Sequence, residues 1–408
     1  MLIGIPMETT VGETRVAVTP ETVKKLKAQG HTLRVQSGAG VAASVTDEAY
    51  VAAGAEITDV AGAFGADMIL KVRPPFANEI SLMKPGAVLV GMLNPFDKDG
   101  LQNLTNANLT GFALEAAPRT TRAQSMDVLS SQANLAGYKA VMIAADKYQR
   151  IFPMLMTAAG TVKAARVVIL GVGVAGLQAI ATAKRLGAVI EASDVRPSVK
   201  EQVESLGAKF IDVPYETAEE KEAAEGVGGY ARPMPQSWLD RQKVEVAKRV
   251  AQADVVISTA LIPGRAAPVL VTEDMVKSMK PGSVIVDLAA ERGGNCDLTI
   301  ADEKIVSENG VTIVGYTDFP SRMAAQASTL YSTNIRHMLT DLTPKKDGII
   351  AHNMEDDVIR GATAAHMGAV TYPPPPPKIA AIAAAKPKEK AKELTPEERR
   401  AQEVVAFK

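Results

Sequence analysis

The sequence predicts an α/β protein with two domains, each built on a parallel sheet, joined by long helices with a cleft between the domains. Short apolar runs alternate with helical stretches along most of the 408 residues, which is the order typical of βαβ units. Runs such as Val167–Leu170 do not alternate between polar and apolar positions, as expected of strands that bury both faces. Only 4% of the residues are aromatic, and a core of small and β-branched side chains suits helices packed closely on parallel strands.

The expected strands fall into two series, one for each domain. The first series is Leu2–Ile5, Thr32–Gln36, Met68–Val72, Val88–Met92 and Gly111–Glu115. The second series is Arg166–Leu170, Val189–Ser193, Lys209–Ile211, Val255–Thr259, Val284–Asp287 and Thr312–Val314. Helices such as Glu21–Gln29 and Lys200–Leu206 fit between the strands.

Two longer helices connect the expected domains. Ser125–Tyr148 has few helix breakers and places a hinge near its end, and Ser328–Leu342 carries the chain back. The first domain is then discontinuous, with residues 1–140 and 328–372, and the second comprises residues 141–327. The segment Val213–Trp238 is expected to be an irregular, mobile surface loop because paired glycines precede Tyr230. Residues 373–408, five prolines and then an Ala/Lys/Glu-rich stretch, are interpreted as a linker or a lone solvated helix.

Composition excludes several classes of function. The 45 basic and 46 acidic residues argue against a broad nucleic-acid-binding surface, which needs a basic excess. The single cysteine, Cys296, rules out an intrachain disulfide and fits a reducing compartment. No apolar run reaches the roughly 18 residues of a membrane-spanning helix. One cysteine and four scattered histidines exclude the usual zinc ligand sets, so no metal site is expected.

The strongest motif is the glycine turn Gly171-Val172-Gly173-Val174-Ala175-Gly176. An expected strand enters it and an expected helix, Ala175–Leu186, leaves it, which is the context of a dinucleotide-binding turn. Gly171 permits the tight turn, Gly173 lets a pyrophosphate approach the backbone, and Gly176 lets helix and strand touch. The helix N-terminus, with Val174 and Ala175, then presents free N–H groups to the diphosphate. The alternative is a purely structural glycine turn.

Asp194 ends the strand that follows the glycine turn, with Val195 and Arg196 after it. Its carboxylate is placed to accept hydrogen bonds from both ribose hydroxyls and would repel a 2′-phosphate, which favours NAD over NADP. Arg196 complicates this argument, because an arginine can bind a 2′-phosphate. A second turn, Thr259-Ala260-Leu261 and the residues to Gly264, follows another strand, and its backbone is expected to pack on the adenosine or ribose. The alternative there is a plain loop.

A polar segment runs from Arg119 to Ser130. Gln124, Asp127, Ser131 and Asn134 have helical spacing on one face of the expected linking helix. One interpretation is a solvated surface. The other is a cleft face that holds a nicotinamide carboxamide, with Asp127 orienting Arg119 or Arg122.

No histidine falls in any of these motifs. A dehydrogenase that oxidises an alcohol or an amine needs a proton acceptor near the reacting carbon, and the sequence offers none. Hydride transfer between two nicotinamides needs orientation but no general base.

These strings of residues are similar to a known family. Over about residues 1–372 the chain resembles the soluble NAD(H)-binding component, or alpha subunit, of proton-translocating, Re/Si-specific nicotinamide nucleotide transhydrogenases. The strings that carry the resemblance are Glu13–Ala17, Arg122–Asp127, Asn134–Tyr138, Thr157–Gly160, Gly171–Leu186, Lys200–Val203, Thr259–Gly264 and Gly293–Cys296.

The resemblance implies a homodimer of chains with two Rossmann-like domains and NAD(H) in the cleft. It implies that the nicotinamide is oriented by a loop that matches Arg119, Gln124, Asp127 and Ser130, and that a mobile loop closes over the nucleotide with Tyr230. It further implies a separate NADP(H)-binding component and a proton-conducting membrane component, with direct hydride transfer between the two nicotinamides. The chain would then be cytoplasmic and peripheral on the inner membrane, with the 373–408 tail as a tether.

Two rival interpretations remain. Alanine dehydrogenases are a related family, and Arg15 and Lys71 match their substrate-carboxylate binders. However, Asn94 stands where their catalytic histidine would fall, while Glu291 aligns with their catalytic acid and decides nothing. A structural salt bridge is the favoured explanation of Arg15 and Lys71. The other rival is a non-catalytic NAD-binding module, which is correct in the sense that the chain alone would bind NADH without moving protons.

Overall fold

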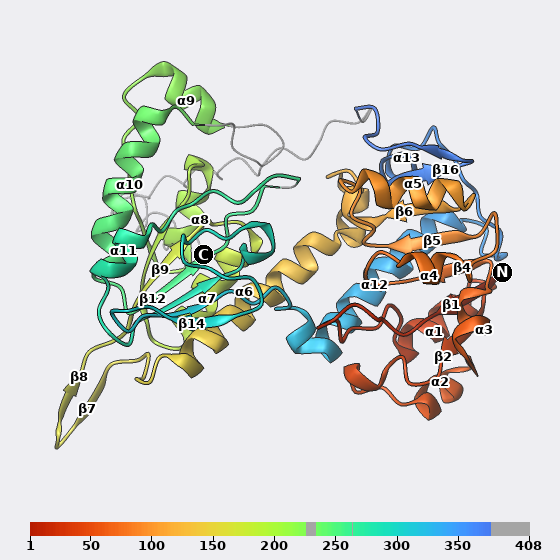
Figure 1. Ribbon diagram of the computed structural model, residues 1–408, viewed down its shortest axis with the longest axis horizontal. Coiled ribbons are helices and arrows are strands. Elements are labelled where there is room, and N and C mark those ends of the chain that lie inside the picture. Colours follow the sequence, from red (N-terminus) through yellow and green to blue (C-terminus); the bar gives the residue numbers. More distant parts are fainter. Residues whose placement is uncertain (226–233, 263, 377–408) are drawn as a thin grey trace, which may run out of the picture.

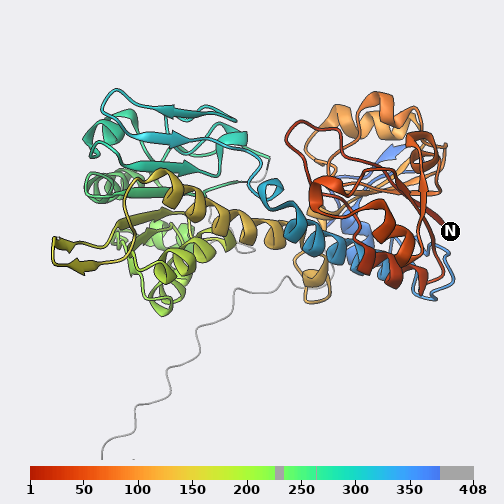
Figure 2. The same ribbon diagram turned by 90° about the horizontal axis from the view of Figure 1, so that it is seen from below.

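Two α/β lobes lie side by side and are joined by two long helices (Figure 1). The computed structural model describes residues 1–225, 234–262 and 264–376. The helices α6 (Val128–Lys147) and α12 (Ala324–Leu342) run between the lobes, and Figure 2 shows the gap that they cross. The predicted class, α/β with two Rossmann-like domains on large parallel sheets, is confirmed.

The first sheet has the strand order β17-β16-β6-β5-β4-β1-β2-β3. Six strands pair in parallel, namely β1 (Leu2–Ile5), β2 (Thr32–Gln36), β3 (Glu56–Thr58), β4 (Met68–Leu70), β5 (Val88–Gly91) and β6 (Thr110–Ala113). Two strands near the end of the described chain, β16 (Thr363–His366) and β17 (Ala369–Val370), extend the sheet with antiparallel pairing. The chain therefore returns to the first lobe after α12. The shorter helices of this lobe are α1 (Pro20–Lys27), α2 (Asp47–Ala53), α3 (Val60–Phe64), α4 (Ala77–Ile80), α5 (Lys98–Asn106) and α13 (Asp357–Ala362).

The second sheet has the order β11-β10-β9-β12-β13-β15-β14. Its parallel strands are β9 (Arg166–Leu170), β10 (Val189–Ser193), β11 (Lys209–Phe210), β12 (Val255–Ser258), β13 (Val284–Asp287) and β15 (Thr312–Val314). The edge strand β14 (Lys304–Val306) is antiparallel to β15. The helices of this lobe are α7 (Val174–Arg185), α8 (Lys200–Ser205), α9 (Ala218–Glu225), α10 (Gln236–Val250) and α11 (Glu273–Ser278).

Each long helix buries part of its surface in one lobe. Tyr331, Ile335 and Met338 of α12 belong to the core of the first lobe. Ala140 and Val141 of α6 belong to the core of the second lobe. Removing these apolar surfaces from water stabilises the two connections as well as the lobes.

Helix α6 crosses α7 at very close range. A Cβ on Gly137 of α6 would lie 2.1 Å from the carbonyl oxygen of Ala175 in the first turn of α7. Only glycine permits this approach, so the linking helix fixes the position of the α7 N-terminus.

The structure contains a hairpin that was not predicted, and it corrects the prediction for part of one segment. Strands β7 (Leu155–Thr157) and β8 (Gly160–Val162) form a hairpin that projects from the second lobe, as Figure 1 shows at its lower left. The segment 213–238 was predicted to be irregular, but it includes α9 and the start of α10. The buried Glu220 of α9 is held by Arg241 of α10 at 2.7 Å, so a run of acids is a packed helix here. Residues 226–233, with Tyr230, and residues 377–408 lie outside the described part of the chain.

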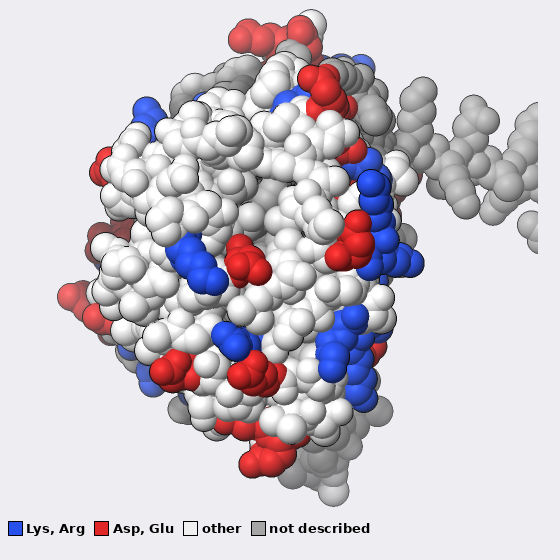
Figure 3. Space-filling view, turned by 90° about the vertical axis from the view of Figure 1, so that its right-hand side faces the viewer, with Lys and Arg blue, Asp and Glu red and all other residues white. Residues whose placement is uncertain are grey.

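The charge distribution agrees with the balanced composition. Figure 3 shows the outer face of the first lobe, where acidic and basic side chains are scattered among uncharged ones. Within the described residues, no helix is both long and apolar enough to cross a bilayer, and no group of three or more His, Cys, Asp or Glu residues is arranged to hold a metal.

Candidate nucleotide-binding site

The glycine turn has the geometry that its sequence predicted. Gly171 has a φ of +91°, and a Cβ there would meet the Thr259 hydroxyl oxygen at 2.9 Å. A Cβ on Gly176 would lie 2.0 Å from the carbonyl oxygen of Gly171. A Cβ on Gly173 would meet nothing within 4 Å. The first and third glycines are thus required by the fold, and the second leaves the backbone open to a ligand.

Helix α7 starts immediately behind this opening. Gly173 is its N-cap residue and Val174 its first residue, and no side chain caps the first turn. The free N–H groups and the helix dipole therefore face the open side of Gly173. A diphosphate fits both features, because it brings negative charge and hydrogen-bond acceptors to the same point.

Asp194 lies at the carboxyl end of β10, next to the turn, and is 7% exposed. Its Oδ2 accepts the Val172 N–H at 2.7 Å, and its Oδ1 accepts the Arg196 N–H at 2.9 Å. The Arg196 guanidinium adds two further bonds, Nε to Oδ1 and Nη2 to Oδ2, both at 2.9 Å. The same Nη2 donates to the Val172 carbonyl at 3.2 Å. The carbonyl of the intervening Val195 accepts the Tyr215 hydroxyl at 3.3 Å.

The second turn is fastened to the first. The Thr259 hydroxyl donates to the Gly171 carbonyl at 2.9 Å. Ala260 exchanges two hydrogen bonds with the side chain of Asn295, N–H to Oδ1 at 3.0 Å and Nδ2 to the carbonyl at 2.9 Å. Leu261 and Ile262 follow with 45% and 44% of their surfaces exposed. The turn thus presents apolar side chains beside a fixed backbone.

Sequence reasoning missed the supports of this second turn. Asn295 is fully buried, and its own N–H donates to the buried Asp287 at 2.6 Å. Asp287 is the last residue of β13 and Asp194 directly follows β10, and each accepts the N–H of the residue two positions on, which is Ala289 for Asp287. An acid at the end of each of two parallel strands was the available signal.

The polar segment is not one helical face. Gln124 lies in a 3₁₀ turn, Arg122–Met126, and α6 begins only at Val128. Asp127 is the N-cap of α6 and has a non-helical backbone. Its carboxylate accepts the N–H and the hydroxyl of Ser130 at 2.9 and 2.6 Å. The predicted stripe from Gln124 to Asn134 was therefore wrong at its first two positions. The Asp127 carboxylate caps the N-terminus of α6, so the helix does not extend back to Gln124.

Arg122 has other partners than the predicted Asp127. Arg122 forms ion pairs with Asp341 of α12, at 3.1 Å, and with Asp356, so Asp127 does not orient Arg122. This pairing ties the segment to the first lobe. Arg119 and Gln124 are exposed, and both precede the Asp127–Ser130 pair in the chain.

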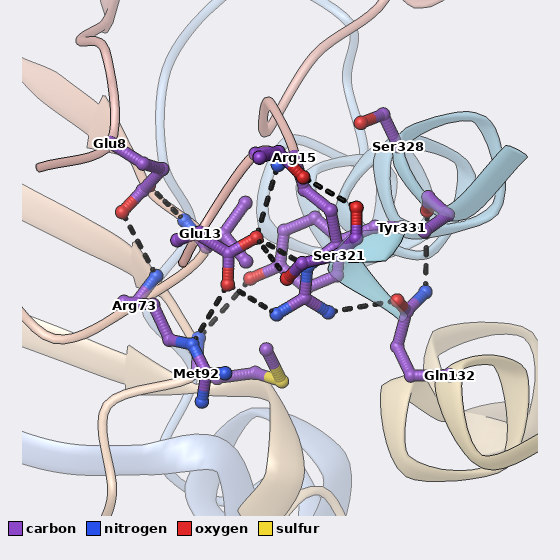
Figure 4. A network of polar contacts seen from close by, with 12 residues as sticks. Glu8, Glu13, Arg15, Arg73, Met92, Gln132, Ser321, Ser328 and Tyr331 are labelled. Carbon is purple, nitrogen blue, oxygen red and sulfur yellow. Dashed lines mark hydrogen bonds and ion pairs between the residues drawn. The ribbon is translucent and has the colours of Figure 1, made fainter. Parts of the chain in front are cut away.

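Arg15 and Lys71 lie in a buried ionic cluster of the first lobe, and Figure 4 shows the contacts of Arg15. Arg15 is 3% exposed and donates to both carboxylate oxygens of Glu13, at 2.7 and 2.6 Å, and to Gln132 at 2.8 Å. Lys71 is 1% exposed and lies 3.3 Å from both Glu8 and Glu79. Both cations thus have acidic partners within the chain, in agreement with the structural salt bridge that the sequence favoured.

The pKa of Glu13 shows that the arginines of this cluster outweigh the effect of burial. Burial alone would raise the pKa of Glu13, but hydrogen bonds from Arg15 and the charges of Arg15 and Arg73 lower it to about 2. The carboxylate is therefore ionised at neutral pH and holds both arginines.

Asn94 follows β5 of the first lobe. Its N–H donates to the Glu115 carboxylate at 2.7 Å. Burial raises the pKa of Glu115 to about 7, against the opposing effect of backbone hydrogen bonds. The next aromatic residue, Phe96, spans to the second lobe, since a Cβ on Gly264 would lie 2.6 Å from its ring. An amide at position 94 cannot relay a proton as an imidazole can.

Comparison with known proteins assigns the chain to a family. Residues 4–136 match the family model "Alanine dehydrogenase/PNT, N-terminal domain", and residues 140–373 match "Alanine dehydrogenase/PNT, C-terminal domain". The chain belongs to the alanine dehydrogenase/PNT family.

Within this family the chain is similar to subunits of transhydrogenases. It is 56% identical to the NAD(P) transhydrogenase subunit alpha of Cereibacter sphaeroides, over 100% of this chain and 78% of that protein. It is 45% identical to the NAD(P) transhydrogenase subunit alpha of Haemophilus influenzae, over 90% of this chain and 71% of that protein. A solved structure of transhydrogenase from Sinorhizobium meliloti is similar with a TM-score of 0.82 and 48% identity, over 91% of this chain and 100% of that one.

Alanine dehydrogenases of the family are more distant. The enzyme of Bacillus subtilis is 30% identical over 91% of this chain and 93% of its own length. The resemblance to transhydrogenase alpha subunits is confirmed, and it supports a role as a nicotinamide-nucleotide-binding component of a transhydrogenase.

Proposed function

We propose that this chain is the NAD(H)-binding component of a proton-translocating nicotinamide nucleotide transhydrogenase. It holds NAD(H) in the cleft between its lobes and exchanges a hydride directly with NADP(H) on a partner component, while a membrane component conducts the coupled protons. The observation that carries the proposal is the open backbone at Gly173, with the N-terminus of α7 behind it and Asp194 beside it. In this proposal the chain is cytoplasmic and peripheral on the inner membrane through its partners.

The second lobe supplies the groups that would hold the nucleotide. The backbone from Gly171 to Gly176, including Val174 and Ala175, receives the diphosphate. Asp194, with Val195 and Arg196, faces the adenosine ribose, and an acid at this position favours NAD(H). Thr259, Ala260 and Leu261 contribute a fixed backbone and an apolar side chain beside it.

The first lobe supplies the groups that would orient the reacting ring, whose dihydro form provides the hydride. Exposed Arg119 and Gln124 offer donors and an acceptor for the carboxamide, and the Asp127–Ser130 pair fixes the start of α6 next to them. Tyr230 is proposed to cover the nucleotide and lies outside the described residues. None of these groups needs to exchange a proton with the substrate, which suits transfer between two nicotinamides.

A homodimer is part of the proposal. The projecting hairpin exposes apolar side chains in a row, with Met154 60%, Leu155 45% and Met156 71% exposed. Such a concentration of apolar surface favours burial against another chain, and we propose a second copy of this chain as its partner.

Reconstitution tests the function. The full chain is mixed with the NADP(H)-binding component of a related transhydrogenase. The reduction of an NAD⁺ analogue by NADPH is monitored by the absorbance of the analogue. We expect the wild-type chain to support this reaction in the mixture. We expect no formation of NADH when L-alanine and NAD⁺ replace NADPH and the analogue. Alanine-dependent NADH formation, or no turnover in the mixture, contradicts the proposal.

One variant separates orientation from binding. Asp127→Asn keeps a residue that can cap α6 but alters the bond to the Ser130 hydroxyl. We expect hydride transfer to slow about tenfold while the Kd for NADH changes by less than about twofold. Asp146→Asn, an exposed acid at the other end of α6, is the matched control. Equal losses of rate and affinity in Asp127→Asn would contradict an orienting role.

A further inference from the structure

The Asp194 carboxylate is already saturated by its own protein. Two carboxylate oxygens offer about four hydrogen-bond positions. Four donors occupy them, namely the Val172 N–H, the Arg196 N–H, and Nε and Nη2 of Arg196. A ribose diol therefore has to displace a donor before it can bind. The Val172 N–H is fixed by the glycine turn and the Arg196 N–H is part of the main chain, whereas the guanidinium ends a long side chain, which leaves it as the group that gives way.

We infer that the Asp194–Arg196 ion pair, rather than Asp194 alone, sets the choice between NAD(H) and NADP(H): Arg196 competes with the ribose hydroxyls for Asp194, and the displaced guanidinium lies where it binds a 2′-phosphate. This inference rests on the proposed function and assigns to Arg196 the role of a specificity-determining residue.

The burial of the two side chains supports displacement. Asp194 is 7% exposed and Arg196 is 22% exposed, so the acid is fixed in the fold and the arginine reaches solvent. The guanidinium is also held by the Val172 carbonyl at 3.2 Å. That bond keeps it next to the glycine turn, beside the ribose rather than away from it.

The charges of the two side chains determine whether each one favours NAD(H) or NADP(H). With Arg196 paired, a 2′-phosphate meets a neutralised pair instead of a bare carboxylate, so NADP(H) is rejected less strongly than Asp194 alone would reject it. Removing the arginine exposes the full charge of Asp194 and frees its oxygens for the diol. Removing the acid releases a fork of donors that fits a phosphate.

Two opposite variants and their combination form the test, with the full chain and calorimetry. The probes are ADP-ribose and its 2′-phosphate, which carry the adenosine end of each dinucleotide and require no partner component. Asp194→Asn keeps an oxygen to accept the Val172 N–H and removes the charge. We expect the ratio of Kd values, 2′-phosphate form over ADP-ribose, to fall at least about tenfold in Asp194→Asn and to rise at least about tenfold in Arg196→Gln.

The double variant and a control complete the design. Asp194→Asn with Arg196→Gln is expected to lose the gain in 2′-phosphate binding. Asp212→Asn changes the charge equally at an exposed acid paired with Lys200 and should leave the ratio unchanged. An unchanged ratio in Arg196→Gln, or a gain that persists in the double variant, would overturn the role of the pair while leaving NAD(H) binding intact. Failure of the wild-type chain to bind ADP-ribose would overturn the proposed function together with this inference.

Discussion

Two acid–arginine pairs with the same spacing lie in the two lobes and have different surroundings. The side chains of Glu13 and Arg15 are 0% and 2% exposed, whereas the side chains of Asp194 and Arg196 are 7% and 22% exposed. In both pairs the arginine lies two residues after the acid and donates from Nε and Nη2. The spacing alone therefore fixes a local ion pair but not its function.

The neighbours of each pair account for the difference. Arg73 and Ser321 add bonds to the Glu13 carboxylate at 2.8 and 2.9 Å, and Gln132 takes the remaining end of Arg15. Both side chains of this pair are almost fully buried among these partners, so the pair stabilises the first lobe. The Asp194 pair lies beside an open backbone at Gly173, so a ligand can replace one of its members.

The largest difference is expected on removal of the two arginines. Arg15→Ala leaves the buried Glu13 with an incomplete set of partners and should lower the free energy of unfolding by about 3–5 kcal/mol. Arg196→Ala removes a partly exposed partner and should cost less than about 1 kcal/mol. Urea denaturation, monitored by circular dichroism, measures the free energy of unfolding of both variants. Comparable losses would show that the two pairs are equally structural and would remove the contrast.

The glycine turn also combines a structural position, Gly176, with a position proposed to bind the ligand, Gly173. A Cβ at position 176 meets backbone, so Gly176→Ala should destabilise the second lobe by about 1–3 kcal/mol. A Cβ at position 173 meets nothing within 4 Å, so Gly173→Ala should leave stability within about 0.5 kcal/mol. It should nevertheless weaken NADH binding, because the new methyl group occupies the approach to the backbone. Denaturation and calorimetry on the same two variants test this, and unchanged affinity in Gly173→Ala would place the diphosphate elsewhere.

The sequence predicted most of the parallel strands well and missed several of the short or antiparallel ones. β9 and β13 were predicted with their observed bounds, because a strand buried on both faces is a continuous apolar run. β3 and β14 were missed, because these edge strands are short and carry exposed polar residues such as Glu56 and Lys304.

The candidate site was predictable only where its parts are local. The glycine turn depends on spacing within six residues, so its geometry followed from the sequence. The bonds between Asn295 and Ala260 join residues 35 positions apart, and no local pattern encodes such a pair. At Asp127 the helical spacing continued through a residue that caps the helix, and periodicity does not distinguish a cap from an interior position.

The last contrast is between two buried acids of the first lobe: Glu13 has cations beside it, and Glu115 forms no ion pair within the part of the chain that the structure describes. Burial raises the pKa of Glu115 from 4.5 to about 7. The folded state therefore holds a proton that the unfolded state releases above pH 4.5, so the contribution of Glu115 to stability is present below pH 4.5 and is lost as the pH rises to about 7. Glu115→Gln keeps an oxygen to accept the Asn94 N–H and removes this titration. Relative to the wild type, the variant should gain on the order of 2 kcal/mol between pH 4.5 and pH 7.5, measured by urea denaturation across that range. Glu56→Gln, at an exposed acid, should show no such gain, and parallel curves for Glu115→Gln and the wild type would mean that Glu115 is ionised in the folded protein at neutral pH.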